Sequence, residues 1–171
     1  MGFLDGIFGG QQKQPEPQRS RNKQVVLLID GPNSIRKGMG IDLREVKKEL
    51  QKYGDIRIAK VYLDQYASDK LIEAMVNQGF QVEITTGDVD VTMAIEAMEF
   101  VLEPETDVLA LMTRDTDFTP MLRKAKKHGR KAIIVAADSA FSTALKNTAD
   151  VVVIMKPAGQ GAAEHIVNEK V

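Results

Sequence analysis

The sequence predicts an α/β fold in which helices cover both faces of a mainly parallel sheet. Short continuous apolar runs of strand length recur along the chain, and amphipathic stretches with helical spacing separate them. This alternation is typical of βαβ units, whose parallel strands become buried on both sides by the crossover helices. A length of 171 residues suits one such domain with short tails.

The expected elements follow from these two patterns in chain order. Residues 24–29 (QVVLLI) form an apolar run, which predicts a strand, and Leu43, Val46 and Leu50 recur at helical spacing, which predicts a helix. The expected strands are 24–29, 56–63, 80–85, 107–113, 131–137 and 151–155. The expected helices are 42–53, 67–78, 91–102, 118–128 and 141–147.

The ends of the chain lack this alternation. Residues 1–23 include a polar, proline-containing stretch, which predicts a flexible segment and linker, and residues 157–171 predict a C-terminal tail with one short helix. The apolar residues within 3–8 allow a weak peripheral contact with a membrane or a partner, although a frayed end is the preferred interpretation. No apolar run is long enough to span a bilayer, and the start lacks the basic leader of a signal peptide. The predicted domain is therefore 24–156.

Composition and missing motifs exclude several function classes. The formal net charge of −1 argues against a strongly basic binder of nucleic acid, but it allows a local basic patch. The chain has no cysteine, which excludes disulfides, thiolate zinc sites and a cysteine nucleophile, and which suits a reducing cytoplasm. It also lacks a P-loop and a serine nucleophile elbow. His128 and His165 are far apart in the sequence and are expected to be ordinary surface residues.

Four acidic residues lie where the expected elements meet. Asp30 ends the first strand, Asp115 and Asp117 follow the fourth, and Asp90 begins the helix between the third and fourth strands. In open α/β sheets, ligands bind beyond the carboxyl ends of the strands where the strand order reverses, and the first and fourth strands are usually neighbours there. We therefore expect the four carboxylates to meet in one crevice.

Each acid also has a local explanation. Asp30 before Gly-Pro-Asn can form an Asx turn, and Asp90 and Asp117 stand at expected helix N-caps, with Pro120 supporting the second cap. Asp115 is harder to explain, because no cap needs both acids of that pair. Clustered carboxylates without a counter-ion have raised pKa values and cost stability, so a hard cation such as Mg²⁺ or Mn²⁺ is the natural partner. Such an ion favours phosphodiester chemistry.

Four short motifs resemble the NYN domain, a PIN-like ribonuclease family, and they occur in the family's order over residues 24–155. The motifs are Asp30-Gly31-Pro32-Asn33, Val89-Asp90-Val91, Thr113-Arg114-Asp115-Thr116-Asp117-Phe118 and the later ALKNTADVVVIM. The resemblance implies a PIN-like (Rossmann-like) three-layer α/β/α sandwich and a metal-dependent nuclease centre. It also implies that Asp30, Asp90, Asp115 and Asp117 are the metal-site acids, with Asn33 beside them.

Two positions depart from the family pattern. Arg114 stands where the family commonly has glycine, and Gly87-Asp88 stands where it often has Lys-Gly. Arg114 either pairs with a substrate phosphate or neutralises the acids without metal, and Asp88 adds a negative charge at the mouth of the site. Both departures leave the catalytic rate and the substrate preference open.

Glu96 matches a further acid position of the family, but its helix suggests a simpler role. A polar stripe lies opposite an apolar one, so a solvated helix face is the preferred interpretation. The polar stripe is Thr92, Glu96, Glu99 and Glu103; the apolar, inward stripe is Ala94, Ile95, Met98 and Leu102.

The expected partner is RNA, single-stranded, bound by a local basic patch. On the helix at 118–128, the apolar side chains face inward and the basic ones outward, while Arg36 and Lys37 flank the other side of the site. The inward residues are Phe118, Met121, Leu122 and Ala125; the outward ones are Arg123, Lys124, Lys126 and Lys127. Exposed lysines often serve only solubility. Aromatic residues are 5% of the chain, so contacts to the RNA backbone and weak sequence preference are expected.

The leading hypothesis is therefore a magnesium- or manganese-dependent ribonuclease. A catalytically weak module of the same family that binds RNA or a partner is the alternative. A Toprim-like phosphoryl-transfer domain ranks third, because that family has glutamate after its first strand where this chain has Asp30. The natural RNA, endo- or exonuclease action and the number of ions stay open, and so does the oligomeric state, for which the resemblance suggests a homodimer.

Overall fold

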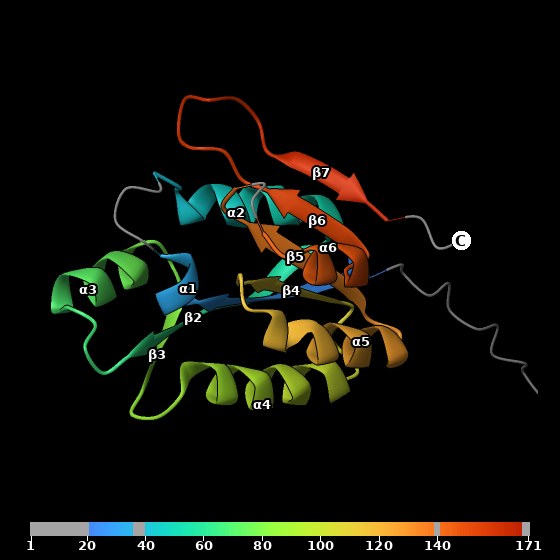
Figure 1. The fold of residues 1–171 in the computed structure, drawn as a ribbon, viewed down its shortest axis with the longest axis horizontal. Coiled ribbons are helices and arrows are strands. Elements are labelled where there is room, and N and C mark those ends of the chain that lie inside the picture. Colours follow the sequence, from blue (N-terminus) through green and yellow to red (C-terminus); the bar gives the residue numbers. More distant parts are fainter. Residues whose placement is uncertain (1–20, 36–39, 139–140, 169–171) are drawn as a thin grey trace, which may run out of the picture.

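The computed structural model describes residues 21–35, 40–138 and 141–168. Within these ranges the strands form one seven-stranded sheet in the order β3-β2-β1-β4-β5-β6-β7 (Figure 1). Neighbouring strands are parallel except for β6 and β7, which are antiparallel. The predicted α/β class with a mainly parallel sheet is confirmed.

The elements agree closely with those predicted. The strands are β1 (Gln24–Asp30), β2 (Asp55–Asp64), β3 (Gln81–Thr85), β4 (Val108–Met112), β5 (Lys131–Ala136), β6 (Val151–Ile154) and β7 (Glu164–Val167). The helices are α1 (Gly31–Ser34), α2 (Leu43–Leu50), α3 (Asp69–Asn77), α4 (Val89–Leu102), α5 (Thr119–Lys127) and α6 (Thr143–Thr148), with 3₁₀ turns η1 (Gln51–Tyr53) and η2 (Thr116–Phe118). Every expected strand and helix is present with its ends shifted by a few residues, and α1 and β7 are additional.

The helices form two layers, one on each face of the sheet (Figure 1). Helices α2 and α3 pack with one set of alternate strand residues, and α4, α5 and α6 pack with the other set. In β1, Leu27 belongs to the first core and Leu28 to the second, because successive strand residues point to opposite faces. The three-layer α/β/α sandwich is therefore confirmed.

The segment after residue 156 corrects the prediction of a tail with a short helix. Residues Glu164–Val167 form β7, which pairs with β6 at the edge of the sheet, with Val153 opposite His165. Ile166 packs against the second core, and His165 contacts Tyr53 and Glu49 with its two ring nitrogens, at 2.5 and 2.7 Å. His165 is therefore a structural residue and not the ordinary surface residue that was expected, whereas His128 is exposed as expected.

Helix α4 buries a different side from the one predicted. Met93, Ala97 and Val101 are fully buried, whereas Ile95 and Leu102, which were expected to face inward, are 59% and 58% exposed. The helix carries apolar residues on two sides at the same spacing, so periodicity could not tell which side the sheet would cover. None of the helices in the described ranges combines the length and the apolar character needed to cross a bilayer.

Candidate active site

The reversal of strand order lies between β1 and β4, at the centre of the sheet. Helices enter from one face before this point and from the other face after it, and Ile29 of β1 lies opposite Met112 of β4. Asp30 ends β1, and the Thr113–Asp117 segment follows β4 directly. The sheet therefore delivers these acids to the same edge, as the sequence predicted.

Asp30 is a fully buried carboxylate that is held by three donors. Its Oδ2 accepts from Asn33 Nδ2 at 2.7 Å and from Thr113 Oγ1 at 2.9 Å, and its Oδ1 accepts from the Asn33 backbone N–H at 3.4 Å. A buried carboxylate requires such donors, because it has lost its hydration. The predicted local turn at Asp30 is present, and Asn33 lies beside the carboxylate.

Gly31 allows the chain to turn closely against β2 immediately after Asp30. A Cβ atom at this position would lie 2.5 Å from the carbonyl oxygen of Tyr62 and would overlap the side chain of Leu63. Any larger residue would push α1 away from the sheet. The glycine of the Asp-Gly-Pro-Asn motif therefore sets the position of Asp30 and Asn33.

Thr113 connects two of the acids through its hydroxyl group. The side chain is buried, donates to Asp30 and accepts from the backbone N–H of Asp115 at 3.1 Å. Thr113 belongs to one of the four motifs, but its position there predicts no role. The sequence feature that could have indicated this role is a hydroxyl residue at the end of a buried strand, two positions before an acid.

The helix caps differ from those predicted. Asp115 Oδ1 accepts from the backbone N–H of Asp117 at 2.8 Å, so Asp115 caps η2 and Asp117 lies inside the turn. Helix α4 begins at Val89, which places Asp90 in its first turn and Asp88 at the N-cap. The predictions of caps at Asp90 and Asp117 are therefore wrong, because each helical element begins earlier than expected.

The electrostatics of Asp90 show that acids from three segments converge. Burial raises the pKa of Asp90 to about 6, with further contributions from the charges of Asp30 and Asp115, a hydrogen bond with Asp115 and the charge of Asp88. Such contributions require the carboxyl groups of Asp30 and Asp115 each to lie near that of Asp90. Acids from the ends of β1 and β4 therefore both approach the start of α4.

Asp117 lies at the rim of this site. Its side chain is exposed and lines, with Asp90, a hollow of about 210 Å³ whose remaining wall is apolar. Val91, Ala94 and Phe118 form that wall. The hollow therefore opens beside Asp90 and Asp117, and neither Asp30 nor Asp115 is among the described residues that line it.

The donor chemistry of the cluster fits a hard divalent cation. The side chains offer only carboxylate and amide oxygens, and a cation would offset both the burial and the neighbouring charges that raise the pKa of Asp90. Across the described ranges, however, no three Asp, Glu, His or Cys side chains are grouped closely enough to hold an ion. Cation binding at this site therefore requires the side chains to draw together.

The comparison with protein families decides the classification. The family model described as NYN domain matches residues 24–156. The chain belongs to the NYN domain family. These are PIN-like nuclease domains, and the match excludes the Toprim-like alternative.

Individual relatives add the fold but no activity. An uncharacterized protein of Methanocaldococcus jannaschii is 53% identical over 136 residues, which cover 80% of this chain and 57% of the relative. The chain thus spans little more than half the length of that relative. A crystal structure of a protein of unknown function from Vibrio parahaemolyticus superposes with a TM-score of 0.67 at 20% identity, over 78% of this chain and 93% of the other. That likeness shows the fold alone.

The two residues that depart from the NYN pattern flank the acids. The guanidinium of Arg114 lies 3.8 Å from Asp138 Oδ2, in the segment after β5. Asp88 is exposed at the start of α4, and its charge contributes to the raised pKa of Asp90. The departures thus place one cation and one additional acid around the cluster of this NYN domain.

Glu96 corrects the prediction of a solvated helix face. Its Oε2 accepts from the Tyr62 hydroxyl at 2.5 Å, and its Oε1 accepts from Lys60 Nζ at 2.6 Å. The Lys60 and Glu96 side chains are only 12% and 25% exposed. Burial and the Glu96 carboxylate raise the pKa of Tyr62, so its phenol stays neutral and donates. The sequence does not indicate a role for Lys60 or Tyr62, because both lie in a strand whose pattern predicts burial.

The basic residues of α5 are arranged largely as predicted. Arg123 and Lys124 are exposed, and the four apolar residues expected to face inward are buried. Lys126 differs, because it donates to the Thr148 carbonyl at 3.0 Å and pairs with Asp150 at 3.1 Å. Arg36 and Lys37 lie outside the described residues.

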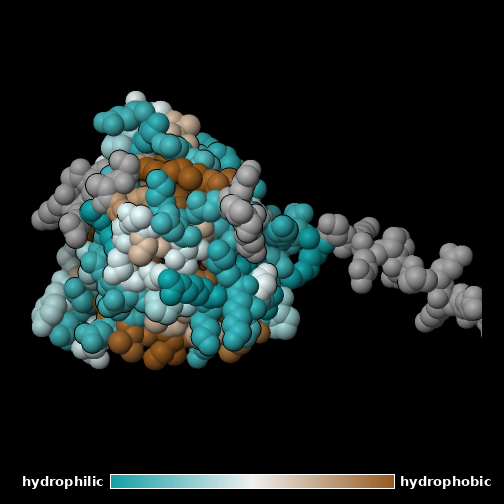
Figure 2. Space-filling model, turned by 45° about the vertical axis from the view of Figure 1, so that its right-hand side comes forward, coloured by the Kyte–Doolittle hydropathy of each residue, from teal (hydrophilic) through white to brown (hydrophobic). Residues whose placement is uncertain are grey.

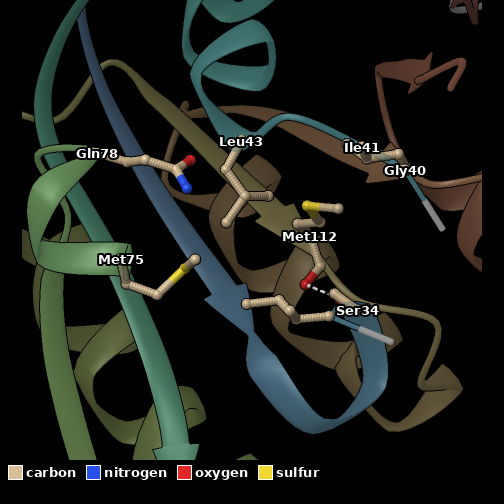
Figure 3. Close-up of a pocket in the computed structure, with 8 residues that line it drawn as sticks. Ser34, Gly40, Ile41, Leu43, Met75, Gln78 and Met112 are labelled. Carbon is tan, nitrogen blue, oxygen red and sulfur yellow. Dashed lines mark hydrogen bonds between the residues drawn. The ribbon is translucent and has the colours of Figure 1, made fainter. Parts of the chain in front are cut away.

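A small cavity of about 90 Å³ lies on the other face of the sheet (Figure 3). Leu43, Met75 and Met112 point toward it, and Ser34 Oγ donates to the Met112 carbonyl at 2.8 Å. None of the described residues that line this cavity is acidic. It is therefore separate from the acid cluster.

Proposed function

We propose that this NYN domain is a metal-dependent ribonuclease that hydrolyses phosphodiester bonds of RNA. The observation that carries the proposal is the convergence of Asp30, Asp90 and Asp115 at the reversal of strand order. Carboxylates from separate segments repel one another, and the charges of Asp30 and Asp115 add to burial in raising the pKa of Asp90. A protein retains such an arrangement at a cost in stability, which suits a binding site for a cation.

In this proposal Asp30, Asp90, Asp115 and Asp117 hold Mg²⁺ or Mn²⁺. The bound ion supplies charge neutralisation at the phosphodiester and an activated water. Asn33 and Thr113 keep Asp30 oriented through the hydrogen bonds at 2.7 and 2.9 Å. Asp90 would hold the cation as a carboxylate, so affinity for the cation should fall as pH drops below about 6.

The proposed substrate is single-stranded RNA that is held by its phosphates. Arg123 and Lys124 project from α5, the helix that follows the Asp115–Asp117 turn, and Arg114 lies at the start of that turn. Arg36 and Lys37, which follow α1 in the sequence and lie outside the described residues, would add two further positive charges. Aromatic residues are only 5% of the chain, so stacking of bases supplies little affinity and sequence preference should be weak.

The test is cleavage of end-labelled single-stranded RNA by the purified chain with either metal. We expect products with Mg²⁺ or Mn²⁺, no products in chelator, and a loss of about 10²-fold or more in Asp115→Asn. Asp55→Asn is the matched control, because Asp55 is exposed at the opposite end of β2 and the change removes the same charge. Cleavage that persists unchanged in Asp115→Asn contradicts the proposal.

An RNA-binding module without turnover is the second candidate, and one observation favours it. Asp115 already uses one oxygen as a cap, and the described acids do not group around a common point. RNA binding that strengthens with Mg²⁺ while no product forms would select this candidate. Pairing of two copies and a cytoplasmic location are further proposals, to be tested by light scattering and by fractionation.

A further inference from the structure

Helix α4 carries an apolar stripe on the side that faces away from the sheet. Val91, Ile95 and Leu102 are 56%, 59% and 58% exposed, and Met98 is half-buried between them. These four residues, called here the α4 stripe, follow one another at intervals of four, three and four positions, which aligns them along one side of a helix. Figure 2 shows apolar side chains gathered along the lower edge of the molecule, where α4 lies.

The fold leaves most of the α4 stripe uncovered, although Met98 packs against the second core and Val91 lines the hollow beside Asp90. Met93, Ala97 and Val101 already supply the side of α4 that packs on the sheet. Among the described residues, no helix or strand carries more than one of the other well-exposed large apolar residues: Tyr66, Val76, Ile84 and Val167. A continuous apolar stripe on a helix surface is typical of a docking surface.

The N-terminal segment of the same chain leaves the fold beside one end of the stripe. Arg21 Nη2 donates to the Pro104 carbonyl at 3.4 Å and pairs with Asp107 at 3.2 Å. Asp107 also accepts from the backbone N–H of Gln24 at 2.8 Å. Pro104 and Asp107 belong to the turn that follows α4, so the chain departs next to the Leu102 end of the stripe.

This departing segment carries apolar residues within reach. Residues 3–8 (FLDGIF) include Phe3, Leu4, Ile7 and Phe8, and residues 1–20 lie outside the described ranges. Residues 9–20 are a linker of about 12 residues, which spans roughly 20 Å on average. Helix α4 has 14 residues and is about 21 Å long. The linker therefore matches the distance along the stripe.

We propose that residues 3–8 bind the α4 stripe of the same molecule. The apolar side chains of both partners then leave water together, and the short linker gives the segment a millimolar effective concentration at the helix. The alternative occupants of the stripe are a second copy of the chain and a membrane. Neither alternative explains why the segment departs at the end of the stripe.

The absence of cysteine makes a direct test straightforward. A nitroxide attached to Gly9→Cys broadens the amide signals of residues near the label in an NMR spectrum of the full chain. We expect the signals of residues 91–102 to lose intensity in dilute protein and to recover after the nitroxide is reduced. Unchanged signals over 91–102 would overturn the proposal.

Two substitutions distinguish binding of residues 3–8 to the α4 stripe from broadening that arises only because the linker keeps the nitroxide near α4. Ile95→Lys places a charge on the stripe at an exposed position, and we expect it to restore the α4 signals. Val76→Lys makes the same kind of change on α3, where Val76 is 55% exposed, and should leave the broadening intact. Broadening that is equally strong in Ile95→Lys reports only the tether and contradicts the proposal.

A mixing experiment and a vesicle experiment address the other occupants. Chain that carries the nitroxide but no ¹⁵N is mixed with chain that carries ¹⁵N but no nitroxide. We expect no broadening of the signals of residues 91–102 in this mixture. Broadening only in the mixture assigns the stripe to a second copy and overturns the proposal. Adding vesicles that contain anionic lipid should leave the broadening within the full chain that carries both ¹⁵N and the nitroxide unchanged. Loss of this broadening when vesicles are added would show that residues 3–8 bind the membrane, and it would overturn the proposal.

Discussion

The hydroxyl of Thr113 donates to the carboxylate of Asp30 across the β1–β4 junction, with Oγ1 2.9 Å from Oδ2. Both side chains are buried, and the same hydroxyl accepts from the backbone N–H of Asp115. One side chain therefore ties together two strands and two acids. Removal of the Thr113 hydroxyl should therefore lower the free energy of unfolding and change the geometry of the site.

Thr113→Val keeps the shape of the side chain and removes the hydroxyl. We expect the free energy of unfolding to fall by about 2 kcal/mol, because a buried carboxylate loses a donor. Thr113→Ser is the control, since it keeps the hydroxyl and loses one methyl group, at a cost of about 1 kcal/mol. Urea unfolding at neutral pH measures both, and equal losses would show that the hydroxyl contributes nothing.

Asp90 should give the metal-free protein a characteristic pH dependence. Its pKa is raised to about 6 in the folded chain from an ordinary value of 3.8, so the folded chain binds the proton more tightly than the unfolded chain. Stability should therefore fall as pH rises from about 4 to about 6 and then level off. Because Asp90 is only partly buried, solvent screens its charge and we expect a change of only about 1 kcal/mol.

Asp90→Asn should remove most of that pH dependence and stabilise the chain at neutral pH. Thermal unfolding in chelator over this pH range measures the effect. Asp88→Asn is the matched control, because Asp88 is exposed and is the last contributor to the raised pKa of Asp90. A slope in Asp90→Asn as steep as that of the wild type would refute the assignment.

Asp115 combines a cap with a repulsive charge, and two substitutions separate them. Asp115→Asn retains an oxygen for the Asp117 N–H and removes the charge beside Asp90, so we expect a higher melting temperature in chelator. Asp115→Ala loses the cap as well and should be less stable than Asp115→Asn by about 1 kcal/mol.

Magnesium should stabilise the wild type more than the Asp115→Asn variant. A cation that binds the folded site raises the melting temperature of the wild type and scarcely affects Asp115→Asn. Differential scanning calorimetry with and without Mg²⁺ measures the shift. Equal stabilisation of both proteins by Mg²⁺ would place the ion elsewhere.

The Glu96 contacts predict a structural cost at a position that sequence periodicity assigned to solvent. Glu96→Gln weakens the contacts to Lys60 and Tyr62, and we expect a loss of about 1–2 kcal/mol. Glu99→Gln on the same helix is the control, since Glu99 is exposed and should change stability by less than about 0.5 kcal/mol. Urea unfolding compares the two, and similar values would restore the solvated interpretation.

RNA binding should depend on the basic residues of α5. The double variant Arg123→Ala/Lys124→Ala should weaken binding uniformly across sequences and reduce the slope of log affinity against log salt by about 2 or less. Lys23→Ala/Lys131→Ala removes the same charge at the opposite end of β1 and β5 and should have little effect. Fluorescence anisotropy with single-stranded RNA at several salt concentrations measures both.

Local patterns were sufficient for the arrangement of the core. Apolar runs such as 24–29 became central strands because a strand covered on both faces needs apolar residues at every position. The placement of Asp30 and Asp115 at one edge followed from topology, since parallel strands end on the same side. Helix α5 also exposes Arg123 and Lys124 as its periodicity predicted.

The predictions from sequence were wrong where two local conformations or packing arrangements were nearly equal in free energy. Apolar residues on both sides of α4 left its buried side ambiguous, and contact with the sheet chose Met93 rather than Ile95. The C-terminal segment reads as a tail by itself, and it becomes β7 only because β6 offers an unpaired edge. Caps moved to Asp88 and Asp115 because the start of a helix depends on neighbours that a single sequence window does not contain.

The sequence by itself determined the α/β class, the order of the elements, the NYN motifs and the identity of the acids. Only the tertiary structure decided which carboxylates interact, that Thr113 bridges Asp30 and Asp115, and that α4 leaves an apolar stripe exposed. The physical reason is that spacing along a chain sets local conformation, whereas burial, pKa and hydrogen bonding depend on which distant segments come into contact.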